Sequence, residues 1–325
     1  MLDVTKQASC IRLVRWIRVL AVATLVATIG LIVLGSAVRV TNSGMGCKGW
    51  PLCSGQVGPI ARFHPLMEQS HRFLVSIVTV LILLLPFLIR RAGAFARHVR
   101  GPALVSVGVI AVQIVLGAIT VLTNNAPVTV ALHLLVATLF LAAVTVTAVA
   151  SFIDSDRSWS LLHRPGRLAW VAIGGLYLVV ISGSIVVNAG AQSACASWPT
   201  CLSSPAATGL GAVQLIHRSM VLVGSLLVVA FVVSMWHKKG TDSVERNLSL
   251  CAIALLAAQV VVGALSALYS SHSEFADLHL GLASALWATV VAVFALSARE
   301  RMAGEPIPRR GDHLPSDRPK TRVLR

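Results

Sequence analysis

Two short stretches of this 325-residue chain place a histidine and an arginine side by side in apolar surroundings. The first, EQSHR at residues 68–72, also carries the carboxylate of Glu68, and the second, QLIHR at residues 214–218, has the amide of Gln214 in its place. Imidazole binds metals and transfers protons, guanidinium binds carboxylates, and a carboxylate can take up a proton or stabilise a cation. The sequence therefore predicts two related sites, and the second site lacks the ionisable group of the first.

Four of the ten histidines fall inside long apolar runs: His71, His133, His217 and His279. Each lies about five to seven residues from the start of its run, which is roughly 7–10 Å along a helix. Ionisable side chains within a membrane are costly and usually functional. The alternative is that these histidines only form hydrogen bonds between helices. That role does not require all four side chains to lie at the same depth. The other histidines fall in loops or tails, where a solvated side chain is the ordinary interpretation: His64, His98, His163, His237, His272 and His313.

The elements that must position these residues are membrane helices. The chain is 56% hydrophobic and 12% charged, with a mean hydropathy of +0.82. Eight apolar runs are each long enough to cross a hydrocarbon layer about 30 Å thick, and backbone in lipid must satisfy its own hydrogen bonds. The runs are 17–38, 66–89, 102–123, 127–152, 168–188, 210–235, 247–269 and 275–297. The predicted fold is an all-α polytopic membrane protein.

The net charge of +15 is a signal of membrane topology. Most of the 27 lysines and arginines lie before the first run, in alternate connections and in the tail, and therefore on one side. By the positive-inside rule both termini are cytoplasmic, and a nucleic-acid partner is not indicated. The first run has a counterpart in the interior of the chain, which argues against a cleaved signal peptide. No amphipathic, Ser-rich presequence is present, so a bacterial inner membrane is the predicted location.

The chain is duplicated. QIVLGAITVLTNNAPVTVALHL (113–134) aligns without a gap to QVVVGALSALYSSHSEFADLHL (259–280), an offset of 146, and both His-Arg pairs share that offset. Residues 35–53 align to residues 183–201 at an offset of 148. Each unit holds four helices, so both halves enter the membrane in one orientation and are expected to be related by a pseudo-two-fold axis along the membrane normal.

The duplication predicts three segments along the chain. Residues 1–160 form the N-terminal four-helix half, residues 161–298 form the C-terminal half, and residues 299–325 form a disordered cytoplasmic tail, because that last segment is polar and rich in proline.

Two opposed imidazoles in each four-helix half indicate the class of ligand. Zinc takes three or four protein ligands, whereas haem iron takes two axial ones. Haem also provides carboxylates, its propionates, for Arg72 and Arg218 to bind. The sequence therefore predicts His71 and His133 as the axial ligands of one haem, and His217 and His279 as those of another.

Two cysteine pairs share a spacing of six around a Trp-Pro sequence: Cys47 with Cys53, and Cys195 with Cys201. Both pairs fall in loops expected on the outer side, where the environment is oxidising. Disulfides that stiffen the loops over the haem sites are one interpretation. A redox-active or haem-handling dithiol is the other, and it fits the first pair best. Cys10 and Cys251 have no partner in the repeat.

These residues resemble the haem A synthase family. The resemblance covers about residues 17–297 and rests on RVTNSGMGCKGWPLC, EQSHR, the four histidines in helices and the second loop CASWPTC, which occur together and in order. It implies oxidation of a ring methyl of haem O to the formyl group of haem A, through an alcohol. It also implies a permanent haem b on His217 and His279, and a substrate haem on His71 and His133 with Glu68 essential. A minor departure is Arg39, whose counterpart in the second half is Val187, so only the first half carries this basic loop residue.

The difference between the two repeat units also indicates the N-terminal half as the one in which the reaction takes place. Glu68 lies one turn before His71 on the same helix face, where it could stabilise charge at an oxidised methyl or accept a proton. An acid favoured by the helix dipole is the alternative for a glutamate near a helix N-terminus. Gln214 leaves the second half with iron ligands but no ionisable group, so electron transfer is its predicted role.

Two other classes of function compete with the synthase. A transmembrane cytochrome with two bis-histidine haems would place haems near both membrane faces, and a transporter would show charged or broken helices at the midplane. Neither pattern is present. By resemblance, a farnesyltransferase that makes haem O and an electron donor are the expected partners.

Overall fold

The computed structural model describes residues 4–298 except 48, 54, 56–59, 154–164, 196, 202–208, 239–242 and 270–272. These residues form an all-α fold, and eight of their helices are long and apolar enough to cross a membrane. The helices are α1 (Val4–Val40), α2 (Phe63–Ala92), α3 (Arg100–Leu122), α4 (Pro127–Ser151), α5 (Arg167–Asn188), α6 (Gly209–Trp236), α7 (Ser243–Leu268) and α8 (Ser273–Ser297). A short 3-10 helix, η1 (Gly93–Val99), joins α2 to α3. The predicted all-α membrane fold is confirmed.

The apolar runs predict the helix boundaries well, with one exception. Seven helices begin and end within about four residues of the predicted runs, but α1 begins at Val4 instead of residue 17. Its first turns are rich in basic residues, so they were not counted as apolar, yet lysine and arginine are good helix formers. The stretch of α1 that is apolar enough to span a membrane is Ser9–Val40.

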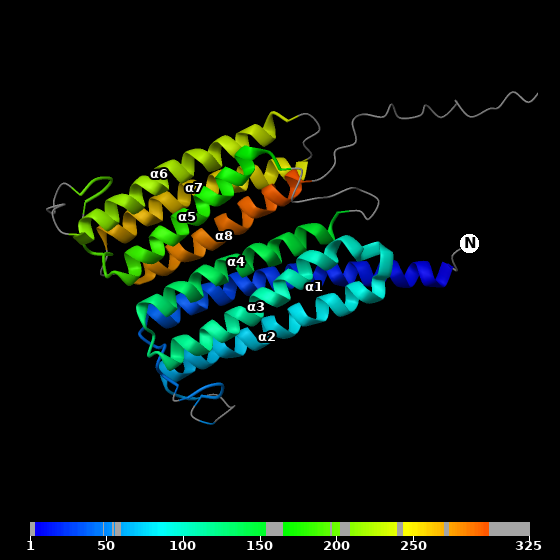
Figure 1. Ribbon diagram of the computed structural model, residues 1–325, viewed down its shortest axis with the longest axis horizontal. Coiled ribbons are helices and arrows are strands. Elements are labelled where there is room, and N and C mark those ends of the chain that lie inside the picture. Colours follow the sequence, from blue (N-terminus) through cyan, green and yellow to red (C-terminus); the bar gives the residue numbers. More distant parts are fainter. Residues whose placement is uncertain are drawn as a thin grey trace, which may run out of the picture.

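The helices form two groups that lie side by side, α1–α4 and α5–α8 (Figure 1). Within each group the closest packing is between α1 and α2, α3 and α4, α5 and α6, and α7 and α8, and the two groups meet through α1, α4, α5 and α8. Trp287 on α8 donates its indole N–H to the carbonyl of Thr138 on α4 at 2.9 Å, and Tyr177 on α5 donates to the carbonyl of Leu135 at 3.2 Å. These bonds join the two halves, because each runs from one half to the other.

The protein interior is apolar, and the outer faces of the helices are apolar as well. Helices α4 and α8 lie at the centre and are the most buried, while large side chains on the peripheral helices, such as Val80, Leu83 and Leu222, are exposed. A soluble protein rarely exposes so much apolar surface, whereas lipid covers it at no cost. The arrangement therefore fits a bundle surrounded by membrane.

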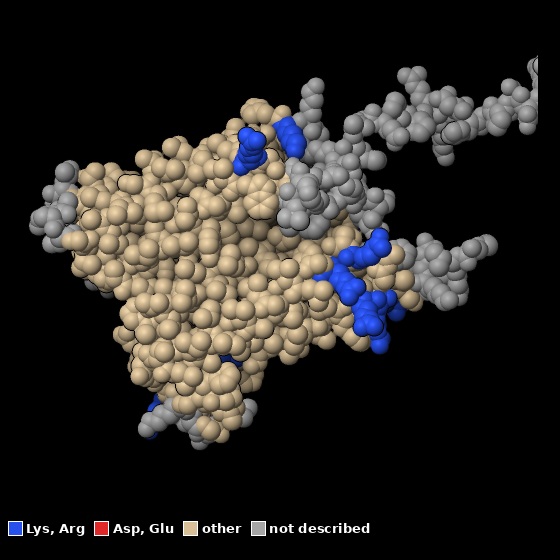
Figure 2. Space-filling model, in the orientation of Figure 1, with Lys and Arg blue, Asp and Glu red and all other residues tan. Residues whose placement is uncertain are grey.

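The two ends of the bundle differ in their connections and in charge. One end, called here the disulfide end, carries the α1–α2 and α5–α6 connections with both cysteine pairs. The opposite end, at which α1 begins, carries most of the lysine and arginine side chains visible on one face (Figure 2). The basic end is the one that the positive-inside rule assigns to the cytoplasm.

Three expectations about organisation stay predictions. The pseudo-two-fold axis is one, and the division at residue 160 is another, because it falls within residues 154–164, which lie outside the described residues. Residues 299–325, for which a disordered tail was predicted, also lie outside them.

Candidate functional site

The four histidines from the apolar runs lie at one end of the bundle. His71 and His217 are each the ninth residue of their helices, α2 and α6, and His133 and His279 are each the seventh residue of α4 and α8. All four helices begin at the disulfide end, so each histidine lies about 10–13 Å along its helix from that end. His71 and His133 are close enough for the charge of one to act on the other, as are His217 and His279. The structure therefore brings together one pair in each half.

A glycine on the adjacent helix makes room for each histidine of α2 and α6. A Cβ atom on Gly35 of α1 would lie 3.0 Å from His71 Nε2, and a Cβ on Gly183 of α5 would lie 3.2 Å from His217 Cε1. Ordinary Cβ contacts are longer than these. The two glycines correspond in the repeat, so both halves hold the imidazole against bare backbone.

The histidines of α4 and α8 have the same arrangement against the other neighbouring helix. A Cβ on Gly117 of α3 would lie 3.2 Å from His133 Cε1, and a Cβ on Gly263 of α7 would lie only 2.7 Å from His279 Cε1. Each of the four imidazoles therefore packs against the backbone of a glycine on a neighbouring helix.

A glutamine one helix away contacts each of these last two histidines. Gln113 Nε2 lies 3.2 Å from His133 Nε2 and donates to the His133 carbonyl at 3.0 Å, and Gln259 Nε2 lies 3.3 Å from His279 Nε2. The Nδ1 atoms of both histidines are buried and have no hydrogen-bond partner among the described residues. A buried imidazole nitrogen without a partner is costly, so each marks a position where a group from outside the chain can bind.

The donor set of each half is two imidazoles. Among the described residues, no three His, Cys, Asp or Glu side chains gather closely enough to hold a metal ion by themselves. Two neutral imidazoles suit a group that brings its own equatorial ligands and needs only axial ones, as a haem does. The residues present therefore fit a haem in each half.

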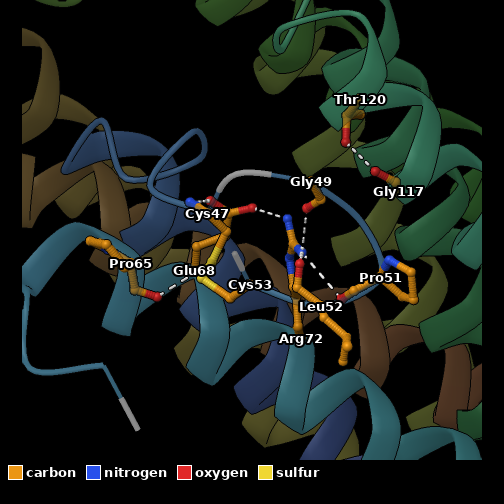
Figure 3. A network of polar contacts seen from close by, with 10 residues as sticks. All are labelled: Cys47, Gly49, Pro51, Leu52, Cys53, Pro65, Glu68, Arg72, Gly117 and Thr120. Carbon is orange, nitrogen blue, oxygen red and sulfur yellow. Dashed lines mark hydrogen bonds and ion pairs between the residues drawn. A yellow bond between two sulfur atoms is a disulfide. The ribbon is translucent and has the colours of Figure 1, made fainter. Parts of the chain in front are cut away.

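The arginine next to each histidine binds the disulfide loop. Arg72 Nη1 donates to the carbonyls of Gly49, Pro51 and Leu52 at 2.9, 3.2 and 3.4 Å (Figure 3). Arg218 Nη1 donates to the carbonyls of Ser197, Pro199 and Thr200, the equivalent residues, at 2.7, 3.2 and 3.4 Å. Sequence reasoning missed this role, because no local pattern links an arginine to carbonyls about 20 residues earlier.

The loops contain two disulfides, which confirms the predicted pairing: Cys47 with Cys53, and Cys195 with Cys201. All four cysteines are buried. Cys10 and Cys251 are free thiols.

Glu68 and Gln214 make opposite use of the same position. The Glu68 carboxylate is buried, accepts the backbone N–H of Cys47 at 2.8 Å through Oε2, and forms an ion pair with Arg72 through Oε1 (Figure 3). Gln214 donates from Nε2 to the carbonyls of Ala191 and Gln192 at 2.9 and 3.1 Å. The acid accepts hydrogen bonds from its surroundings, whereas the amide donates them to its loop.

The expectation that the second half has no ionisable group besides its histidines and arginine is wrong. Asp277 lies on α8 two residues before His279 and accepts a hydrogen bond of 2.5 Å from Ser36 Oγ on α1. Its charge also acts on Arg39. Ala131 occupies the equivalent position in the first half, so the repeat alignment contained the signal. Because Asp277 bonds to the other half, it belongs to the junction between them.

His64, interpreted above as a solvated loop residue, instead lies in the first turn of α2. Its side chain is exposed, as expected, but Nδ1 lies 3.0 Å from the hydroxyl of the buried Ser43. The sequence interpretation missed this contact, because Ser43 is 21 residues away.

The tightest of the glycine contacts gives a testable consequence. Replacing Gly263 by Ala should push the His279 ring away and lower the haem content of the purified protein. Gly174→Ala in the same half is the matched control, since a Cβ there meets nothing within 4 Å. Haem per protein, measured by absorbance of the extracted pyridine complex, should fall in the first variant only; equal content in both would show that the close approach is not needed.

The sequence matches one family model over most of its length. The model is COX15-CtaA, described as cytochrome oxidase assembly protein, and it matches residues 18–65 and 61–291. Among curated proteins, the heme A synthase of Geobacillus kaustophilus is 29% identical over 299 residues, which cover 87% of this chain and 92% of that protein. The heme A synthase of Shouchella clausii is 32% identical over 254 residues, covering 75% and 82%.

Proposed function

Because the chain belongs to the COX15-CtaA family of cytochrome oxidase assembly proteins, we propose which of its residues carry out the reaction that its relatives are named for. The chain functions in haem A synthesis and is an oxidoreductase: a ring methyl of haem O becomes the formyl group of haem A. What has to be assigned is which half binds the substrate and which side chains act on it.

The proposed substrate ligands are His71 and His133, and the proposed ligands of a resident haem b are His217 and His279. One difference between the halves supports this division. Ser182 Oγ lies 2.8 Å from His217 Nδ1, whereas the residue aligned with Ser182 in the first half is Leu34. A hydrogen bond to one ring nitrogen fixes the orientation of an imidazole that binds metal through the other nitrogen, and it strengthens that binding. A permanently bound haem needs that support more than a substrate that must leave. When bound there, haem b would supply electron transfer.

Glu68 is the proposed catalytic residue. Oxidation of a methyl group to a formyl group removes protons from carbon, so the site needs a base or a stabilising charge. Glu68 stands one helical turn from His71 and is held by the Cys47 N–H and Arg72. The single observation that carries the proposal is that this acid is an amide in the other half, where the neighbouring arginine makes the same contacts with its loop.

Arg72 and Arg218 are proposed to bind haem propionates in addition to their loops. Each guanidinium has five N–H donors, and these are not all used by the loop contacts of Nη1 and by the contact of Nη2 with Glu68 in one half and with the Cys195 carbonyl in the other. A propionate at either position would join an arginine already fixed by the loop, so little side-chain freedom would be lost on binding. The disulfides hold the loop carbonyls that in turn orient each arginine.

The proposed location is the bacterial cell membrane, with both termini in the cytoplasm. The basic residues at the end where α1 begins support this orientation (Figure 2). The haem sites would then lie near the outer face. An electron donor and a farnesyltransferase that supplies haem O are the proposed partners. Because both histidine pairs lie at one end of the bundle, a transmembrane electron carrier without catalysis is the weaker alternative.

The experiment that tests this assignment is a haem inventory. The full-length protein is purified from cells that make haem O, and its haems are extracted and identified by mass. We expect haem b together with haem A and its hydroxylated intermediate. Haem b alone, with haem O unchanged in the membranes, would contradict catalysis and favour the electron-carrier alternative.

A further inference from the structure

A short chain of hydrogen-bonded side chains covers the reacting half at the disulfide end. Thr41 Oγ1 lies 2.7 Å from Ser43 Oγ, and Ser43 Oγ lies 3.0 Å from His64 Nδ1. Ser43 is fully buried, and His64 is exposed. A buried hydroxyl thus holds an imidazole whose ring reaches the surface.

The same loop binds both His64 and Glu68. Gly46 packs against the first turn of α2 so closely that a Cβ there would lie 2.5 Å from the His64 carbonyl carbon. The next residue, Cys47, donates its N–H to Glu68 at 2.8 Å. His64 and Glu68 are four residues apart on α2, so they occupy neighbouring positions on one helix face. The loop and the helix together hold an exposed imidazole one helical turn from the buried carboxylate, on the side of the disulfide end.

The second half has none of these polar groups. At the positions equivalent to Thr41, Ser43, His64 and Glu68 it carries, in order, Ala189, Ala191, Leu210 and Gln214. Ala191 is as buried as Ser43, and Leu210 is exposed like His64. The backbone arrangement is therefore compatible with apolar residues, and the polar chain is not needed to build the loop. It accompanies the acid and is absent where the acid is absent.

We propose that His64 carries protons between Glu68 and the aqueous phase at the disulfide end, and that Ser43 positions its imidazole. The inference rests on the proposed role of Glu68. In the step, the protonated Glu68 carboxyl gives its proton to the neutral imidazole, which becomes imidazolium and then releases the proton to water. Glu68 returns to its carboxylate form for the next oxidation, and no electrons move in this step. Imidazole is the side chain best suited to such transfer near neutral pH.

The test compares turnover in purified full-length variants with haem O as substrate and with haem content as a second readout. His64→Ala should lower kcat at least about tenfold, with KM for haem O and bound haem unchanged. Added 2-methylimidazole, whose methyl group hinders binding to iron, should restore turnover. Leu210→Ala, the equivalent position in the other half, is the control and should behave as wild type with and without the additive.

Three other results would each contradict one part of the proposal. Full turnover in His64→Ala beside an inactive Glu68→Gln would remove the relay and leave the role of Glu68 standing. A loss that 2-methylimidazole does not restore but that His64→Gln avoids would show that His64 only supports the loop. Full turnover in Glu68→Gln would instead remove the catalytic role on which the relay depends.

Discussion

Replacing Glu68 by Gln is expected to lower the turnover of haem O by about 10²–10⁴-fold, the usual contribution of a positioned acid–base group. The amide cannot accept a proton or hold a negative charge beside His71. The measurement is the rate of haem A formation by the purified protein, followed by mass. Haem content should stay at the wild-type level, because Glu68 is not one of the proposed iron ligands.

The second half indicates that this variant will fold. Gln214 already occupies the equivalent position, and Arg218 Nη1 makes the same contacts with its loop that Arg72 Nη1 makes with the first, while Arg218 Nη2 donates to the Cys195 carbonyl instead of an acid. The matched control is Glu245→Gln. Glu245 is a completely buried glutamate in the first turn of α7, at the opposite end of the bundle. The control should keep normal turnover. Equal losses in both variants would attribute the effect to buried charge in general instead of to Glu68.

The second large effect concerns the iron ligands. His217→Ala should remove haem b from the purified protein, because the C-terminal half offers two imidazoles and a haem with one ligand lost is held weakly. His71→Ala is the counterpart at the same helix position and should keep haem b while losing the substrate haem. Turnover should be abolished in both.

The readout is the identity and amount of each haem extracted per protein. Haem b at the wild-type level in His217→Ala, or its loss from His71→Ala alone, would reverse the proposed division of the two halves. Ser182→Ala should act in the same direction as His217→Ala but more weakly, with about 10–100-fold weaker binding of haem b.

The sequence predicted the parts of this molecule that depend on local composition and on the repeat. Helices of membrane length follow from the apolar runs, and the depth of the four histidines follows from their common distance to the helix starts. The offset of 146 makes His71 equivalent to His217 and His133 equivalent to His279 from the sequence alone. The two disulfides followed from spacing and from the expected location of their loops.

Contacts between segments far apart in the chain could not be predicted in this way. Nothing in the pattern links Ser36 to Asp277, which are 241 residues apart, or Ser43 to His64. The glycines facing the histidines were visible only as small residues, which are common in membrane helices. Their contact with the histidines depends on how neighbouring helices pack, which the sequence pattern does not contain.

The loop contacts of Arg72 and Arg218 change how the sites are understood. From the sequence, these arginines were expected to bind propionates, and that role stays a prediction. In the structure their Nη1 atoms hold the disulfide loops, so the arginine, the loop and the acid form one unit. Loss of either disulfide is thus expected to disturb the neighbouring haem site.

The most direct test of the account is the mass of the haems that remain bound to Glu68→Gln protein purified from cells that make haem O. If the N-terminal half binds the substrate and Glu68 carries out the chemistry, the protein will contain haem b and unreacted haem O, without haem A or its hydroxylated intermediate. Haem A in the variant at the wild-type proportion would contradict the account, because the acid that distinguishes the two halves would then not be needed.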